Sequence, residues 1–179
     1  ELISASATPE KIDLLQCDLA SISILTPTSV PGYRIAEKLR ARGIKVVFGG
    51  MHASAMPEEA KQYGDAVVIG EAETAWPEVL RDFRAGALKS FYRGEQIPLD
   101  DLPTPLYGML KDKHQFRIVN TSRGCPYNCT FCSVKPFYGG DIRFRPIDHV
   151  VRDVAAIPEK MYINGDENIW WQGFEQRAI

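Results

Sequence analysis

The chain has 179 residues, of which 45% are hydrophobic and 25% are charged, the balance of a globular protein with one ordinary domain or two small ones. This composition excludes a disordered or collagen-like chain, and no apolar run approaches the roughly 18 residues that a membrane-spanning helix needs. The formal net charge of −2 comes without a block of basic residues, so we expect no nucleic-acid partner.

Helical and strand patterns alternate through the first half of the chain. We expect helices at about residues 8–15, 31–42, 57–62 and 74–83, and strands at about residues 19–25, 44–48 and 66–69. Helices that alternate with nearly continuous apolar strands indicate a parallel sheet that is covered on both faces. The expected fold class is therefore α/β, with a doubly wound, Rossmann-like or flavodoxin-like domain.

Each of these predicted strands runs at its carboxyl end into small or hydroxyl residues. They are Thr26, Thr28 and Ser29 after the first strand, Gly49 and Gly50 after the second, and Gly70 with Glu71 after the third. Ligands of open α/β sheets bind in the crevice at those ends, where glycine lets a backbone come close to a ligand. Simple capping of the strands explains the same residues equally well, so both interpretations stay open.

The chain changes character near Gly86 and has three prolines within residues 98–105. We interpret residues 89–113 as a linker between a domain at residues 1–88 and a second domain at residues 114–179. In the second domain we expect strands at residues 116–120 and 161–163 and a helix at residues 148–156. Arg143 and Arg145 are expected to be exposed on an edge strand.

Three of the four cysteines, Cys125, Cys129 and Cys132, lie within eight residues. No secretory leader is visible, so the expected compartment is the reducing cytoplasm, where clustered thiols more often bind metals than form disulfides. Three thiolates at these spacings can hold one side of a 4Fe–4S cluster and leave one iron open to another ligand. Cys17 lies in an apolar run and is expected to be a small buried hydrophobe.

Two other interpretations of the cysteine loop compete with this one. Three cysteines together with His149 or His114 would form a structural zinc site, although zinc motifs usually begin with two close pairs. A ferredoxin-type run would end in a cysteine followed by proline, whereas Cys132 is followed by Ser133.

The spacing C-x3-C-x2-C, with Phe131 directly before the last cysteine, resembles the radical S-adenosylmethionine superfamily. Together with Gly49-Gly50-Met51-His52, Gly70-Glu71-Ala72-Glu73 and Arg143-Phe144-Arg145-Pro146, the chain resembles its members that carry an N-terminal cobalamin-binding domain. The resemblance implies that the second domain is the start of a partial (β/α) TIM-type barrel. Because the chain supplies only some strands of each domain, we expect it to be a fragment that is inactive alone.

The resemblance also implies an activity, that of an oxidoreductase or methyltransferase. A 4Fe–4S cluster would reductively cleave S-adenosylmethionine to a 5′-deoxyadenosyl radical, which abstracts hydrogen from a small-molecule substrate, with methyl transfer where cobalamin is bound. A reducing partner such as flavodoxin or ferredoxin would supply the electron. The alternatives that remain are the structural zinc module and a cobalamin carrier without catalytic activity.

The family's functional positions can be assigned to residues of this chain. The metal ligands implied are Cys125, Cys129 and Cys132, and the residues implied to bind S-adenosylmethionine are Phe131, Asp166 and Glu167. The positions implied to bind cobalamin are Ser23, Leu25, Thr26, Gly49, Gly50, His52, Gly70 and Glu71. The Asp-x-His-x-x-Gly motif that gives cobalt a histidine in many cobalamin proteins does not occur in the chain. Either this motif lies upstream, or cobalt has no histidine ligand, or cobalamin does not bind.

Overall fold

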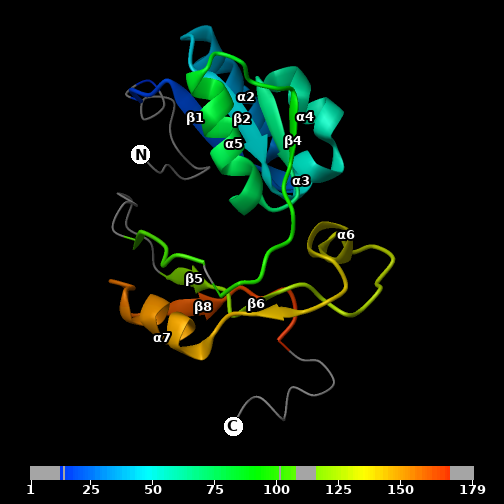
Figure 1. The fold of residues 1–179 in the computed structure, drawn as a ribbon, viewed down its shortest axis with the longest axis vertical. Coiled ribbons are helices and arrows are strands. Elements are labelled where there is room, and N and C mark those ends of the chain that lie inside the picture. Colours follow the sequence, from blue (N-terminus) through cyan, green and yellow to red (C-terminus); the bar gives the residue numbers. More distant parts are fainter. Residues whose placement is uncertain (1–12, 14, 101, 108–115, 170–179) are drawn as a thin grey trace. The chain divides into compact units, whose positions relative to one another are not determined.

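A computed structural model describes residues 13, 15–100, 102–107 and 116–169 of the chain (Figure 1). It divides into two compact units, one that ends at Ile97 and one that begins at Pro98. The helix predicted at residues 8–15 lies almost wholly outside the described residues.

The first unit contains a parallel sheet of four strands in the order β1-β2-β3-β4. The strands are β1 (Leu19–Ser23), β2 (Lys45–Gly49), β3 (Ala66–Ile69) and β4 (Phe91–Arg93). All three pairings are parallel, and Ser23 at the end of β1 lies opposite Gly49 at the end of β2. The parallel α/β fold predicted from the sequence is thereby confirmed, while β4 falls in the segment that we interpreted as a linker.

Among the described residues of this unit, five helical segments accompany the sheet. They are the 3-10 helix η1 (Thr26–Thr28) and the α-helices α2 (Ser29–Ala41), α3 (Gly50–Ala55), α4 (Pro57–Tyr63) and α5 (Ala72–Arg84). The helix α2 stops where predicted, because Gly43 has a φ of +81° and its N–H bonds to Arg40 O at 2.9 Å. Pro57 begins α4, where its missing N–H breaks no helical bond. The short helix α3 was not predicted.

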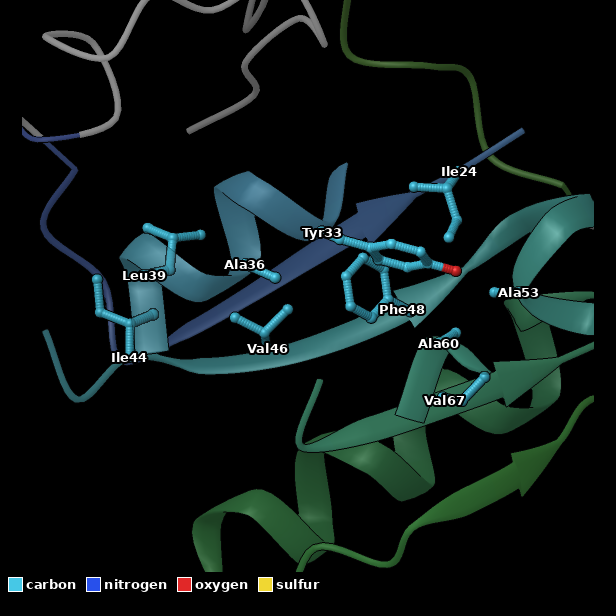
Figure 2. Close-up of a cluster of buried hydrophobic side chains, with 10 residues drawn as sticks. All are labelled: Ile24, Tyr33, Ala36, Leu39, Ile44, Val46, Phe48, Ala53, Ala60 and Val67. Carbon is cyan, nitrogen blue, oxygen red and sulfur yellow. The ribbon is translucent and has the colours of Figure 1, made fainter. Parts of the chain in front are cut away.

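Both faces of the sheet are buried, as the apolar strands predicted. Side chains alternate along β2, so Val46 and Phe48 point to one face and Val47 to the other. On the first face they pack with side chains from α2, α3 and α4, including Tyr33, Ala53 and Ala60 (Figure 2). On the other face Val47 packs with Ala75 and Val79 of α5. Burial of each large side chain contributes about 1.5–3 kcal/mol to folding.

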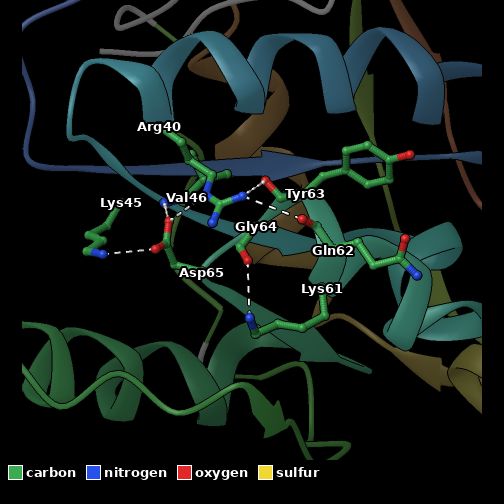
Figure 3. Close-up of polar contacts among 8 residues, drawn as sticks. All are labelled: Arg40, Lys45, Val46, Lys61, Gln62, Tyr63, Gly64 and Asp65. Atoms are coloured by element: carbon green, nitrogen blue, oxygen red, sulfur yellow. Dashed lines mark hydrogen bonds and ion pairs between the residues drawn. The ribbon is translucent and has the colours of Figure 1, made fainter.

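Asp65 ties the start of β3 to β2 (Figure 3). Its carboxylate accepts the Val46 N–H at 2.9 Å and lies 2.9 Å from Lys45 Nζ and 3.5 Å from Arg40 Nε. Burial alone would raise the pKa of Asp65, but the Val46 hydrogen bond and the two cations hold that pKa below its ordinary value. The ionised carboxylate therefore fastens two parallel strands at their amino ends.

The second unit contains two small sheets. Strand β5 (Arg117–Val119) pairs in parallel with β8 (Tyr162–Asn164), and β6 (Ser122–Arg123) pairs antiparallel with β7 (Arg143–Phe144). The helices are α6 (Val134–Tyr138) and α7 (Ile147–Ala155). A parallel pair with α7 between its strands agrees with a β–α–β unit, and the start of a barrel stays a prediction.

Within the described ranges, no helix combines the length and the apolar character that crossing a membrane requires.

Candidate functional site

The loops that follow β1, β2 and β3 meet at one edge of the first sheet, because parallel strands end on the same side. We call residues 23–26, 49–52 and 70–71 the carboxyl edge. They contain every position at which the resemblance implies cobalamin. Ser23, Leu25 and Thr26 are exposed there, whereas His52 and Glu71 are buried.

Two adjacent glycines of the carboxyl edge have different surroundings. Gly50 has a φ of +90°, and a Cβ on it would lie 2.7 Å from Ser23 Oγ and 2.8 Å from Ile24 O. Gly50 is therefore needed to close the two loops on each other, and the bond from His52 N to Ile24 O at 3.1 Å completes that closure. A Cβ on Gly49 would meet nothing within 4 Å, so open space lies beside Gly49.

His52 is linked to side chains on both sides of its ring. Thr26 Oγ1 lies 3.1 Å from His52 Nδ1, and Glu59 Oε1 lies 3.4 Å from His52 Nε2. Only 8% of His52 is exposed. Both ring nitrogens of His52 therefore have protein partners in this structure.

The third loop of the edge packs against β4. Gly70 has a φ of +85°, and its N–H bonds to Ser54 Oγ at 3.0 Å. A Cβ on Gly94 would lie 1.5 Å from Glu71 O, so this glycine lets the chain after β4 lie against the loop. Sequence reasoning missed Gly94, because only the pairing of β3 with β4 brings it to this edge.

The cysteine loop follows β6 directly. Gly124 has a φ of +99°, and a Cβ there would lie 2.2 Å from Asp141 O, so only glycine fits where the loop leaves the strand. Cys125 and Cys132 are half-buried, Cys129 is exposed, and all three are free thiols. The loop turns through a bond from Cys132 N to Cys129 O at 3.1 Å.

Three free thiols on one loop have the donor chemistry of an iron–sulfur cluster. Across the ranges that the structure describes, no three or more His, Cys, Asp or Glu side chains are gathered as a metal site, and this holds for the cysteines with His149 as well. His114 lies outside those ranges. The donors therefore fit a cluster in kind. Cys17 is exposed, so its predicted burial was wrong.

Asp166, a predicted ligand of S-adenosylmethionine, is used within the protein. Its carboxylate accepts the backbone N–H groups of Thr121 at 2.6 Å and Ser122 at 3.0 Å and also the Thr121 hydroxyl. These bonds join the turn after β8 to the connection between β5 and β6. The carboxylate is thereby occupied by groups of its own chain.

Glu167 is the next residue and has a different environment. Burial raises the pKa of its carboxyl, and the neighbouring Asp166 raises it further, against the opposing effects of the Gly124 N–H and of Arg123. Oε2 of Glu167 is buried without a hydrogen-bond partner among the described residues. Asn168 follows, with its Nδ2 3.9 Å from Cys125 Sγ. An unsatisfied carboxylate oxygen beside the cysteine loop is suited to a donor that the protein does not supply.

Phe131 is strongly exposed, with 91% of its surface accessible. It stands directly before Cys132, so its ring is free to stack on a flat ligand.

Arg145 is not exposed as the sequence suggested. Its Nη2 lies 2.6 Å from Oδ2 of Asp153, a residue with 0% exposure on α7, and its Nη1 donates to Asn120 O at 3.2 Å. The ion pair therefore holds α7 against the strands that carry the cysteine loop. Arg143 is half-buried, and the prediction that both arginines are exposed was wrong.

Comparison with known proteins finds similar proteins that match most of the chain. Residues 4–80 match the family model of the B12 binding domain. The chain is 30% identical over 151 residues to bacteriochlorophyllide d C-12(1)-methyltransferase of Chlorobaculum tepidum, which covers 80% of this chain and 33% of that protein. It is 36% identical over 135 residues to the C-8(2)-methyltransferase of the same organism, covering 70% of this chain and 30% of that protein.

A solved structure has a similar fold. The radical S-adenosylmethionine methyltransferase TsrM from Kitasatospora setae superposes with a TM-score of 0.66 and 16% identity, over 89% of this chain and 39% of TsrM. The chain spans about a third of the length of the curated relatives it matches. These matches agree with the family resemblance: residues 4–80 match the B12 binding domain, most of the chain is similar to two methyltransferases, and its fold is similar to that of a radical S-adenosylmethionine methyltransferase.

Proposed function

We propose that this chain binds cobalamin at the carboxyl edge and a 4Fe–4S cluster through Cys125, Cys129 and Cys132, as part of an enzyme that transfers a methyl group to a small molecule. The observation that carries the proposal is the presence, in one chain, of a B12 binding domain and of three free thiols on one loop. The two curated relatives described above are methyltransferases by name, which supports methyl transfer as the reaction.

Cobalamin would lie against the exposed residues of the carboxyl edge. Support comes from the exposure of Ser23, Leu25 and Thr26 and from the open space beside Gly49. The other positions of the edge would not need to contact cobalamin themselves. They would hold the loops in shape through their own contacts, and they are Gly50, His52, Gly70 and Glu71.

S-adenosylmethionine would bind between the cysteine loop and the turn after β8. Glu167, with its unpartnered Oε2, is the carboxylate suited to the ammonium group of this ligand, whereas Asp166 would hold the turn in place. Phe131 would stack against the adenine. When bound, the reduced cluster would supply the electron that cleaves S-adenosylmethionine, and cobalamin would supply the methyl group. A flavodoxin or ferredoxin would act as electron donor.

The cluster is tested by anaerobic reconstitution with iron and sulfide, followed by electron paramagnetic resonance of the reduced protein. We expect about four irons per chain and a signal that changes when S-adenosylmethionine is added. Cys129→Ser should abolish the cluster, and Cys17→Ser is the matched control that should retain it. One tightly held zinc ion per chain, with no iron, would overturn this part of the proposal.

Cobalamin binding is tested separately by titration of the chain with hydroxocobalamin, followed by absorbance. We expect saturable binding with one cobalamin per chain. Absence of binding at millimolar cobalamin would contradict the assignment of the carboxyl edge.

A further inference from the structure

Four side chains from four different elements form a hydrogen-bonded series that ends at the carboxyl edge. Tyr33 of α2 donates to Glu59 Oε1 at 3.0 Å, the same oxygen lies 3.4 Å from His52 Nε2, and His52 Nδ1 lies 3.1 Å from Thr26 Oγ1. Tyr33 and His52 are buried, and Thr26 is exposed. The series therefore connects the core of the domain with its surface.

The proton positions in this series follow from the chemistry of its members. A carboxylate only accepts hydrogen bonds, so Glu59 receives both the Tyr33 hydroxyl and the His52 Nε2–H. Burial and the neighbouring Glu59 raise the pKa of Tyr33, which keeps its hydroxyl protonated as a donor. In the Nε2–H tautomer of His52, Nδ1 can only accept, and the Thr26 hydroxyl then donates to it.

Thr26 is thereby left as an acceptor toward the outside. Its one hydroxyl proton is donated to His52, so only the lone pairs of Oγ1 remain for a ligand at the carboxyl edge. The backbone carbonyl of Thr26 already accepts the Ser29 hydroxyl at 3.0 Å. The side-chain oxygen is then the acceptor that Thr26 offers to a ligand.

We propose that Tyr33 and Glu59 are positioning residues that, through His52, fix Thr26 as a hydrogen-bond acceptor for a primary carboxamide N–H of the ligand. This inference rests on the proposed cobalamin function and adds the polarity of one contact. The rim of a corrin ring carries carboxamide side chains, whose N–H groups are donors. A ligand with ester groups at these positions offers no such donor.

The test compares two corrinoids, dicyanocobinamide with its carboxamides and dicyanocobyrinic acid heptamethyl ester without them. Thr26→Val should lower the affinity for dicyanocobinamide about five- to tenfold, which corresponds to the loss of one hydrogen bond. Thr26→Ser should retain the affinity. Neither variant should change the affinity for the ester. Equal affinity of the unmodified chain and Thr26→Val for dicyanocobinamide would overturn the inference and leave the cobalamin site intact.

The positioning role has its own readout in the His52 ring. Nitrogen NMR of the chain labelled at its three histidines should give the Nε2–H tautomer for the signal that His52→Gln removes. Glu59→Gln keeps an acceptor oxygen and should retain both this tautomer and the affinity. Glu59→Leu should remove the preference of His52 for the Nε2–H tautomer. It should also lower the affinity for dicyanocobinamide about as much as Thr26→Val does.

Combination of the two changes decides whether Glu59 acts through Thr26. In the Thr26→Val background, Glu59→Leu should cause no further loss, because the acceptor is already absent. If the affinity losses of Glu59→Leu and Thr26→Val multiply in the double variant, Glu59 does not act through Thr26 and its positioning role is overturned. If neither dicyanocobinamide nor hydroxocobalamin binds the unmodified chain, the proposed function fails and this inference fails with it.

Discussion

We expect the two adjacent glycines at the carboxyl edge to have separate roles, Gly50 in folding and Gly49 in ligand access. Gly50→Ala should lower the free energy of unfolding by about 1–3 kcal/mol, because the new methyl group would meet Ser23 Oγ and Ile24 O in a left-handed backbone. Gly49→Ala should change it by less than about 1 kcal/mol, since nothing lies within 4 Å of a Cβ there.

The cobalamin titration separates the two roles further. Gly49→Ala should lower the affinity for cobalamin without loss of stability, because its methyl group would occupy the space that we assign to the ligand. Urea unfolding and absorbance titration of both variants make the comparison. A Gly49→Ala chain that binds cobalamin as well as the unmodified chain would show that the open space is not used.

Asp65 makes the stability of the first unit dependent on pH. Its pKa is lower in the folded chain than in the unfolded chain, so its stabilising contribution is present above about pH 4 and is lost as the pH falls through the folded pKa. Asp65→Asn keeps an acceptor for the Val46 N–H but removes the charge, and should cost about 1 kcal/mol at pH 7.

This cost should shrink as the pH falls below the unfolded pKa and through the lower folded pKa of Asp65, where the unmodified carboxyl also becomes neutral. Unfolding in urea at several pH values measures the difference between the two chains. Asp18→Asn is the control, because Asp18 is exposed. A difference that stays constant down to pH 3 would contradict the role of the charge.

At the scale of elements, the ion pair between Arg145 and Asp153 holds α7 in the second unit. Asp153→Ala should destabilise this unit by about 3–5 kcal/mol, because it leaves a buried guanidinium without its partner at 2.6 Å. Asp148→Ala on the same helix should cost less than about 1 kcal/mol, since the Asp148 side chain is 82% exposed.

Hydrogen exchange of α7 peptides measures both effects. The double variant Arg145→Met with Asp153→Leu removes both charges and should recover part of the lost protection. Equal exchange in Asp153→Ala and Asp148→Ala would mean that the pair does not hold the helix.

Elements with a strong local pattern were predictable from the sequence, and elements held by distant partners were not. The first three strands and α5 have apolar runs or helical spacing of sufficient length, and their predicted bounds differ from the structure by two residues or fewer at each end. Strand β4 has three residues and depends on pairing with β3, while β6 and β7 have two residues each and depend on one another. Pairing between distant segments leaves no periodic signal in such short stretches.

The same distinction applies to the candidate sites. The cysteine spacing could be recognised because all its donors lie on one loop. The sequence could not separate Asp166 from Glu167, because both follow the same strand and only the contacts of Asp166 with Thr121 and Ser122 show which carboxylate is occupied. Glu59 and Tyr33 were missed for the same reason, since the fold alone brings them to His52.

At the scale of the whole molecule, the candidate residues for cobalamin and those for the iron–sulfur cluster lie in different compact units. The carboxyl edge belongs to the unit that ends at Ile97, and the cysteine loop belongs to the unit that begins at Pro98. Because the two sets of residues lie in different units, the effects of their substitutions on cofactor loading should be independent. We therefore expect the two cofactors to load separately.

The triple variant Cys125→Ser, Cys129→Ser and Cys132→Ser should lose its iron and bind hydroxocobalamin within about twofold of the unmodified chain. Conversely, Thr26→Val with Gly49→Ala should lose cobalamin affinity and retain its iron. Iron analysis after reconstitution and absorbance titration give the two occupancies independently. A triple variant that no longer binds cobalamin would contradict separate loading, because it would mean that the cobalamin site requires an intact cluster in the other unit.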